Sequence, residues 1–173
     1  MDELLSHIKE SLPPYERAWS LCETYLAQST WLSRPVRRDQ LFSELLNVVY
    51  ERKRPSHNAN VYSNSNPVNG KPVAPTSFRM IHEYMLLFAV FAMGALYDLT
   101  IPPYSDEAEK YYQLSRSLLT LEMICEMPSV LVVQALILLA KYHAASDRRT
   151  SSEAQWTLSS MASIVAKNVS YSD

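Results

Sequence analysis

The sequence predicts an all-α fold in which antiparallel helix pairs form an array. Apolar residues recur at intervals of three, four and seven positions along most of the 173 residues, the spacing of a helix face. Only two glycines occur, whereas folds built from strands need many tight turns. Ten prolines fall between the periodic segments, where they separate one helix from the next.

Residues 1–51 are predicted to form a helical lead-in. A short amphipathic segment ends at Pro13 and Pro14, and this pair can begin the next helix because proline fits the first helical turn. Asp39 is expected to cap a later helix. The apolar faces of these two helices contain Tyr15, Ala18, Trp19, Cys22, Tyr25 and Leu26, and then Leu41, Phe42, Leu45, Leu46, Val48 and Val49.

Residues 52–77 are predicted to be a long flexible loop. From residue 51 to residue 77 the chain holds four prolines, five asparagines, four serines and one glycine. Such a segment buries too little apolar surface to offset the entropy lost on ordering. The loop therefore separates the lead-in from a second helical part, residues 78–173.

The second part begins with a predicted helix over 78–98 that is apolar on nearly all sides and belongs in the centre of the fold. Its longest apolar run, 84–97, is shorter than the about 20 residues that cross a bilayer, so we expect a core helix and no membrane contact. Ser105, followed by acidic residues, is expected to cap the next helix. Its predicted buried side contains Ala108, Tyr111, Tyr112, Ser115, Leu118, Leu119 and Met123.

Pro128 and Ser129 are expected to start an apolar helix that carries one polar residue, Gln134. A buried amide without partners costs about 1–3 kcal/mol, so Gln134 is expected to tie neighbouring helices together; a ligand contact between helices is the alternative. A final helix over about 152–167 is expected to face inward through Trp156, Met161, Ala162 and Val165, with Trp156 as a packing anchor.

A faint repeat of 44 residues pairs Tyr112 with Trp156, Leu114 with Leu158, Leu118 with Ala162 and Leu121 with Val165. Stacked helix pairs repeat on about this length. Alternating amphipathic helices produce the same match by chance, and both interpretations stay open.

The sequence predicts no catalytic residue, no cofactor-binding residue and no metal ligand, and hence no enzyme. His82 and Glu83 resemble the start of a zinc-protease motif, but Leu86 stands where the second histidine belongs, so a helix-surface pair is expected. Gly70 and Gly94 are the only glycines, too few for a phosphate-binding loop.

Other charged groups have ordinary explanations. Glu122 and Glu126 share a helix face and are expected to be solvated surface. The basic triplet 52–54 is either a weak nuclear import signal or a helix end that complements the helix dipole. A net charge of −2 does not favour direct binding of nucleic acid. Cys22 and Cys125 fit reduced thiols in the cytosol or nucleus better than a disulfide.

Several stretches together resemble the fungal-specific transcription factor domain, the helical middle homology region of fungal binuclear zinc-cluster regulators. These stretches are 12–18, 25–26, 31, 35–36, 50–51, 87–96, 108–112, 128–129, 133–136, 156 and 161–162. The resemblance spans roughly residues 12–166 and implies a nuclear protein that takes part in the regulation of transcription through contacts with other proteins or with the rest of a transcription factor.

The sequence departs from the family in two ways. The zinc-cluster module of the family needs six cysteines in a compact basic segment, and this sequence has two, so zinc is expected only in a missing module and DNA contact only indirectly. Members usually continue past the last helix, so we expect a truncated regulatory domain. Its helices over 84–97 and around Gln134 should then leave apolar sides uncovered and promote self-association. A stand-alone helical-repeat scaffold for protein–protein interaction is the alternative.

Overall fold

The computed structural model describes residues 2–29, 33–53, 76–102, 105–119, 128–146 and 151–172. Within these ranges every regular element is a helix, which confirms the predicted all-α class. The elements are α1 (Asp2–Glu10), α2 (Tyr15–Thr24), η1 (Tyr25–Ser29), η2 (Gln40–Leu46), α3 (Asn47–Lys53), α4 (Thr76–Leu96), α5 (Asp106–Ser117), α7 (Val130–Ala145) and α8 (Ser151–Ser172). The two η elements are π-helices, which are wider than α-helices.

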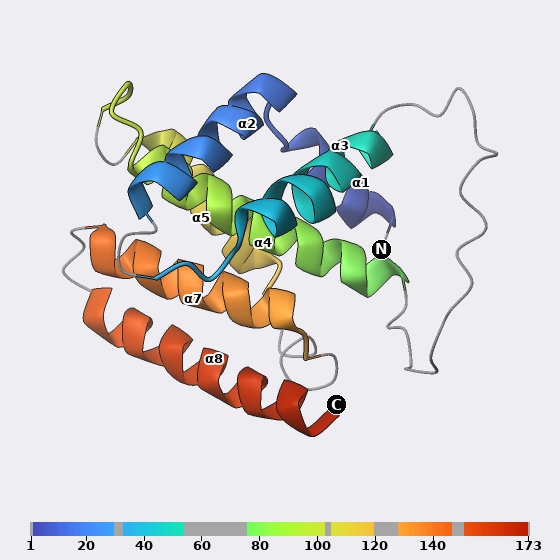
Figure 1. Cartoon of the computed structure of the whole chain (residues 1–173), viewed down its shortest axis with the longest axis vertical. Helices are drawn as coiled ribbons and strands as arrows, with labels where there is room; N and C mark the ends of the chain where they lie inside the picture. The colour runs from blue at the N-terminus through green and yellow to red at the C-terminus, as the bar shows by residue number, and fades with distance from the viewer. Residues whose placement is uncertain are drawn as a thin grey trace.

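Helix α4 lies in the middle of the fold and contacts α2, both π-helices, α5 and α7 (Figure 1). Every residue from 81 to 95 is buried, which confirms the predicted central position. The expectation that this helix leaves an apolar side uncovered is wrong, because helices of the same chain surround it.

The stretch Phe78–Leu96 is long and apolar enough to cross a membrane by length and composition. Its most apolar window is 83% buried within the fold, as expected for the core helix of a helical array.

The lead-in packs directly on α4 through α2, η1 and η2. Asp39 is not a cap: its backbone is already helical (φ −61°, ψ −45°), and its side chain makes no capping bond. The amide of Leu41 donates to the carbonyl of Arg37, so the helical bonding begins before Asp39.

Aromatic rings join the two helical pieces of the lead-in at the surface. Trp19 lies 4.2 Å from the ring of Phe42, and Tyr15 lies 5.3 Å from the ring of Tyr50, measured between centroids. Tyr15 and Trp19 belong to the predicted apolar face but stay partly exposed. Their rings therefore cover the junction of α2 with η2 and α3 rather than filling the core.

Two predicted caps are confirmed. The hydroxyl of Ser105 accepts a hydrogen bond from the amide of Ala108 at the start of α5. The hydroxyl of Ser129 accepts one from the amide of Val132 at the start of α7. Each cap satisfies a backbone donor that the first turn of a helix leaves without an intrahelical partner.

Two predicted boundaries differ from those in the structure. Helix α3 continues to Lys53 and α4 begins at Thr76, so the predicted loop 52–77 is helical at both ends; its residues 54–75 lie outside the described part of the chain. Helix α8 extends to Ser172 instead of ending near residue 167.

Trp156 is not the packing anchor that the sequence predicted, because its side chain is exposed. Ala162 and Val165 are buried as expected, and Met161 is half-buried. The first pair of the 44-residue repeat therefore joins a buried residue, Tyr112, to an exposed one. The repeat does not describe equivalent positions there.

Candidate functional site

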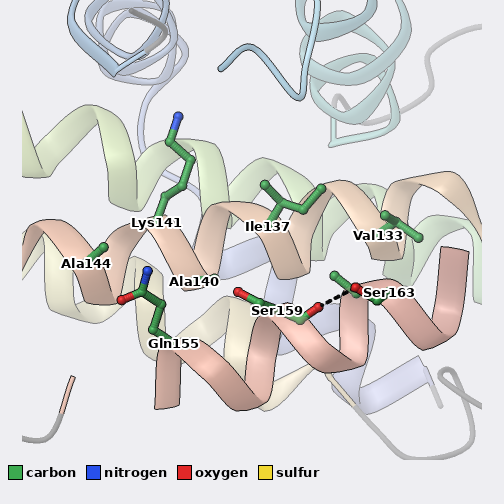
Figure 2. A pocket seen from close by; sticks show the side chains of 9 residues that line it. Val133, Ile137, Ala140, Lys141, Ala144, Gln155, Ser159 and Ser163 are labelled. Atoms are coloured by element: carbon green, nitrogen blue, oxygen red, sulfur yellow. Dashed lines mark hydrogen bonds between the residues drawn. The ribbon is translucent and has the colours of Figure 1, made fainter. Parts of the chain in front are cut away.

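The α7–α8 pair lies at the edge of the fold (Figure 1). Helix α8 runs back along α7 and packs on it, on the side of α7 away from α4 (Figure 1). An open groove of about 360 Å³ follows the junction of the two helices (Figure 2). It is lined by Val133, Ile137, Ala140, Lys141, Ala144, Gln155, Ser159, Ala162 and Ser163.

The charged group at the rim of this groove has a structural role. The ammonium of Lys141 donates to the carbonyl oxygens of Ser29 (2.9 Å) and Ser33 (3.1 Å). Ser29 is the last residue of η1, where free carbonyls attract a cation. Desolvation lowers the pKa of Lys141. Lys141 therefore caps η1 and binds the lead-in to α7, and the rest of the groove is apolar or neutral.

The outward face of α8 exposes large apolar side chains. Trp156 is 74% exposed, Ile164 is 55% exposed and Tyr171 is 89% exposed. At 100° per residue these three side chains lie within about 80° of one another, opposite the face that packs on α7.

Gln134 ties α7 to the lead-in, which supports its structural interpretation over the ligand one. Its amide nitrogen donates to the carbonyl of Pro35 (2.8 Å) and to the side-chain oxygen of Gln40 (3.0 Å), and its oxygen accepts from Gln40 (2.8 Å). The paired amides satisfy each other, so Gln134 can sit half-buried in an otherwise apolar helix.

Substituting Gln134 with leucine should lower the free energy of unfolding by about 1–2 kcal/mol, because the Pro35 carbonyl and the Gln40 amide lose their partner. Urea denaturation followed by circular dichroism measures this. Gln113→Leu is the control, since Gln113 is exposed and should change stability by less than about 0.5 kcal/mol. Equal stabilities of the two variants would show that the tie contributes nothing.

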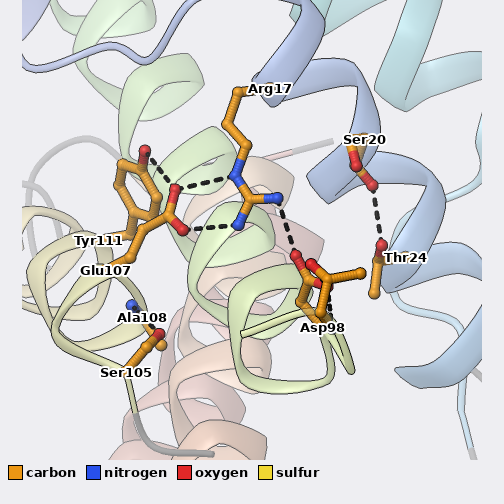
Figure 3. A network of polar contacts seen from close by, with 9 residues as sticks. Arg17, Ser20, Thr24, Asp98, Ser105, Glu107, Ala108 and Tyr111 are labelled. Atoms are coloured by element: carbon orange, nitrogen blue, oxygen red, sulfur yellow. Dashed lines mark hydrogen bonds and ion pairs between the residues drawn. The ribbon is translucent and has the colours of Figure 1, made fainter. Parts of the chain in front are cut away.

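A second polar network joins α2 to both ends of the α4–α5 connection (Figure 3). The guanidinium of Arg17 donates to both oxygens of Glu107 (3.1 and 2.6 Å) and to Asp98 (2.8 Å). The carboxyl of Asp98 also accepts hydrogen bonds from the hydroxyl and the amide of Thr100. These bonds, together with the weaker effect of Arg17, hold the pKa of Asp98 below its ordinary range. The sequence analysis missed this network, because Arg17 is 81 and 90 positions from its partners.

His82 and Glu83 are buried, so the predicted helix-surface pair is wrong. Glu83 forms ion pairs with Arg52 of α3 and Arg79 of α4. Arg52 thus joins α3 to α4, which favours a structural role for the basic triplet over an import signal. The hydroxyl of Ser129 lies 3.0 Å from Nδ1 of His82.

His82 makes stability depend on pH. Desolvation lowers its pKa, so the folded state binds fewer protons than the unfolded state below about pH 6.5. Its stabilising effect is therefore present above that pH and is lost as the pH falls. We expect the free energy of unfolding to fall between about pH 7 and pH 5.

The variant His82→Gln should flatten this part of the pH profile, because an amide does not titrate there. The exposed His7 supplies the control, and His7→Gln should change the profile less than His82→Gln does, because His7 is not buried in the fold. The measurement is urea denaturation at half-unit pH steps. An unaltered slope in His82→Gln would assign the pH dependence to another group.

The remaining residues considered from the sequence do not come together in one site within the described part of the chain. The hydroxyl of Tyr112 lies 2.6 Å from Nε2 of His143 inside the core, and Cys22 is a buried free thiol. His57, Glu122, Glu126 and Cys125 lie outside the described residues. In the described ranges no group of three or more His, Cys, Asp or Glu residues could hold a metal ion.

The architecture defines a class of protein: an all-helical domain in which Gln134, Arg17 and Lys141 tie separate helices together. The model of the family described as "Fungal specific transcription factor domain" matches residues 59–172, more than half of the chain, and the chain belongs to this family. The match includes α4, α5, α7 and α8, whereas the upstream resemblance over 12–51 lies outside it. No curated protein and no solved structure matches the chain.

Proposed function

We propose that the chain acts in the nucleus as a regulatory domain of a zinc-cluster-type transcription factor and works through contacts with other proteins. Family membership over residues 59–172 carries this proposal. DNA is then reached only through another module or protein, since two cysteines cannot build a six-cysteine cluster and the net charge is −2. Residues 1–51 serve as the lead-in that packs on this domain.

The α7–α8 junction is the element on which a regulatory partner would act. Helix α8 lies at the edge of the fold and packs mainly on α7, and an open groove follows their junction. A partner that prefers one position of α8 shifts the domain toward that position. Groove residues such as Ala140 and Ser159 are small, so the partner can approach the helix backbones.

A reporter assay tests the function. The whole chain is fused to a bacterial operator-binding domain and brought to a reporter gene in a fungal cell. We expect the fusion to raise or lower transcription relative to the operator-binding domain alone. Ser159→Trp fills the groove and should reduce the effect, whereas Ser170→Trp, on α8 outside the groove, should not. A fusion without effect on the reporter would contradict the proposal.

A further inference from the structure

A small hollow lies between the start of α2 and the helix α3. It has a volume of about 70 Å³ and is lined by Tyr15, Asn47, Tyr50 and Glu51. A water molecule needs at least about 10–15 Å³ of such space, so the hollow has room for roughly five groups of that size. It therefore fits the end of one side chain, whereas pockets for drug-sized ligands measure about 300–1,000 Å³.

Two tyrosine rings form adjoining walls of this hollow, and each ring is held by a hydrogen bond. The ring centroids of Tyr15 and Tyr50 are 5.3 Å apart, and the two planes meet at 76°. The hydroxyl of Tyr15 donates to Oδ1 of Asn47 (3.0 Å), and the hydroxyl of Tyr50 donates to the carbonyl of Pro13 (2.6 Å). The rings are therefore fixed before a ligand binds, which lowers the entropy cost of binding.

The charged group of the hollow is a carboxylate. Glu51 is exposed, and in the described part of the chain it forms no ion pair. The face of an aromatic ring is the negative side of its quadrupole, so Tyr15 and Glu51 both attract a cation. The ammonium of Lys53 lies 6.0 Å from the centre of the Tyr50 ring and donates to the carbonyl of Leu12. Tyr50 thus already faces one cation, and the ring of Tyr15, 41% exposed, is the one available to a ligand.

A guanidinium matches this combination of groups better than an ammonium. It is planar and stacks on a ring face, and its paired N–H groups donate to both oxygens of a carboxylate, whereas an ammonium is a compact point charge. The neighbouring surface of the same chain shows the arrangement. The guanidinium of Arg38 lies 5.0 Å from the centre of the Phe42 ring and donates to both carboxylate oxygens of Glu23 (2.9 and 2.5 Å).

We propose that the hollow receives the guanidinium of an arginine side chain from a partner protein, stacked on Tyr15 and paired with Glu51. The size of the hollow favours a side chain over a free ligand, since it encloses only the head group and the rest of the partner stays outside. This inference goes beyond the proposed function, because residues 15–51 lie outside the range 59–172 that shows the family. The reporter assay and a binding assay on the hollow therefore succeed or fail separately.

A chemical-shift titration of the ¹⁵N-labelled full chain tests the site. The probes are three blocked tripeptides, Gly-Arg-Gly, Gly-Lys-Gly and Gly-citrulline-Gly, and citrulline has the shape of arginine without its charge. We expect the arginine peptide to shift the amide signals of Asn47 and Glu51. Its dissociation constant should be about tenfold lower than that of the citrulline peptide, because only the arginine peptide gains the cation–π contact and the ion pair. The lysine peptide should bind more weakly than the arginine peptide.

Two variants assign the binding to the hollow. Glu51→Gln keeps the size of the side chain and removes its charge, and Tyr15→Leu keeps an apolar side chain and removes the ring. Each should raise the dissociation constant of the arginine peptide at least about threefold. Glu153→Gln and Tyr171→Leu are the matched controls and should leave it unchanged, since both residues are exposed on α8, which does not line the hollow.

Circular dichroism and thermal melting verify that every variant is folded. Equal binding of the arginine and citrulline peptides would show that charge plays no part. Equal binding of the arginine and lysine peptides would show that the site does not recognise a planar cation. Either result, or an affinity unaltered in both Glu51→Gln and Tyr15→Leu, would overturn the proposal.

Discussion

Substituting Gly94 with alanine should lower the free energy of unfolding by about 3 kcal/mol, although alanine favours helices more than glycine by about 1 kcal/mol. A Cβ atom at this position would lie 2.2 Å from the carbonyl oxygen of Leu21 and 2.9 Å from its carbonyl carbon. Both atoms belong to the backbone of α2, so no side-chain rotation relieves the clash. Helices α2 and α4 would have to separate.

Chemical denaturation of Gly94→Ala and of a matched variant in another helix measures this effect. Ala144 is exposed near the end of α7, and Ala144→Gly should cost up to about 1 kcal/mol through helix propensity alone. Glycine is therefore unfavourable at an ordinary helical position and required at position 94. A Gly94→Ala protein as stable as the parent would show that the two backbones do not approach this closely.

The variant Arg17→Met should lose about 3 kcal/mol of stability at neutral pH. Methionine keeps the apolar stem but leaves the carboxylates of Asp98 and Glu107 without their cation. Asp98 is buried, so its uncompensated charge is costly. The loss should exceed that of Arg38→Met, the control, because Arg38 and its partner Glu23 are both exposed and exposed ion pairs contribute little to stability.

The pH dependence of this loss identifies its origin. The pKa of Asp98 is lowered in the folded protein, so its contribution to stability is fully present above the ordinary aspartate pKa of about 3.9 and is lost as the pH falls below it. The stability difference between the parent and Arg17→Met should therefore narrow below about pH 4. A difference that stays constant down to pH 2 would assign the effect to packing.

The approximate positions of the helices and two of the three caps could be predicted from the sequence, because they depend on neighbours in the chain; the cap expected at Asp39 was wrong because this residue lies inside a helix that begins before it. Ser105 and Ser129 cap helices by bonding amides three residues later, and the all-apolar stretch around Phe88 can only be a core helix. The exposure of Trp156 could also have been predicted. It lies nine residues from the buried Val165, which places it on the opposite side of the helix.

The candidate surfaces could be predicted only in part. The sequence indicated that Gln134 ties helices together, but it could not identify Pro35 and Gln40 as its hydrogen-bond partners. For the same reason His82 and Glu83 were expected at the surface: their partners, Ser129 and Arg52, lie far away along the chain.

The sequence by itself determined the helical class, the caps at Ser105 and Ser129, the core helix and the family, because these depend on local periodicity and on the order of short motifs. Only the tertiary structure decided which backbones touch at Gly94, which carboxylates Arg17 neutralises and which face of α8 remains open. The physical reason is distance along the chain. The contacts at Gly94 and Arg17 join helices that are far apart in the chain and meet only when the fold packs around α4. Helical periodicity shows which side of a helix is apolar, but it does not show which other helix will pack there.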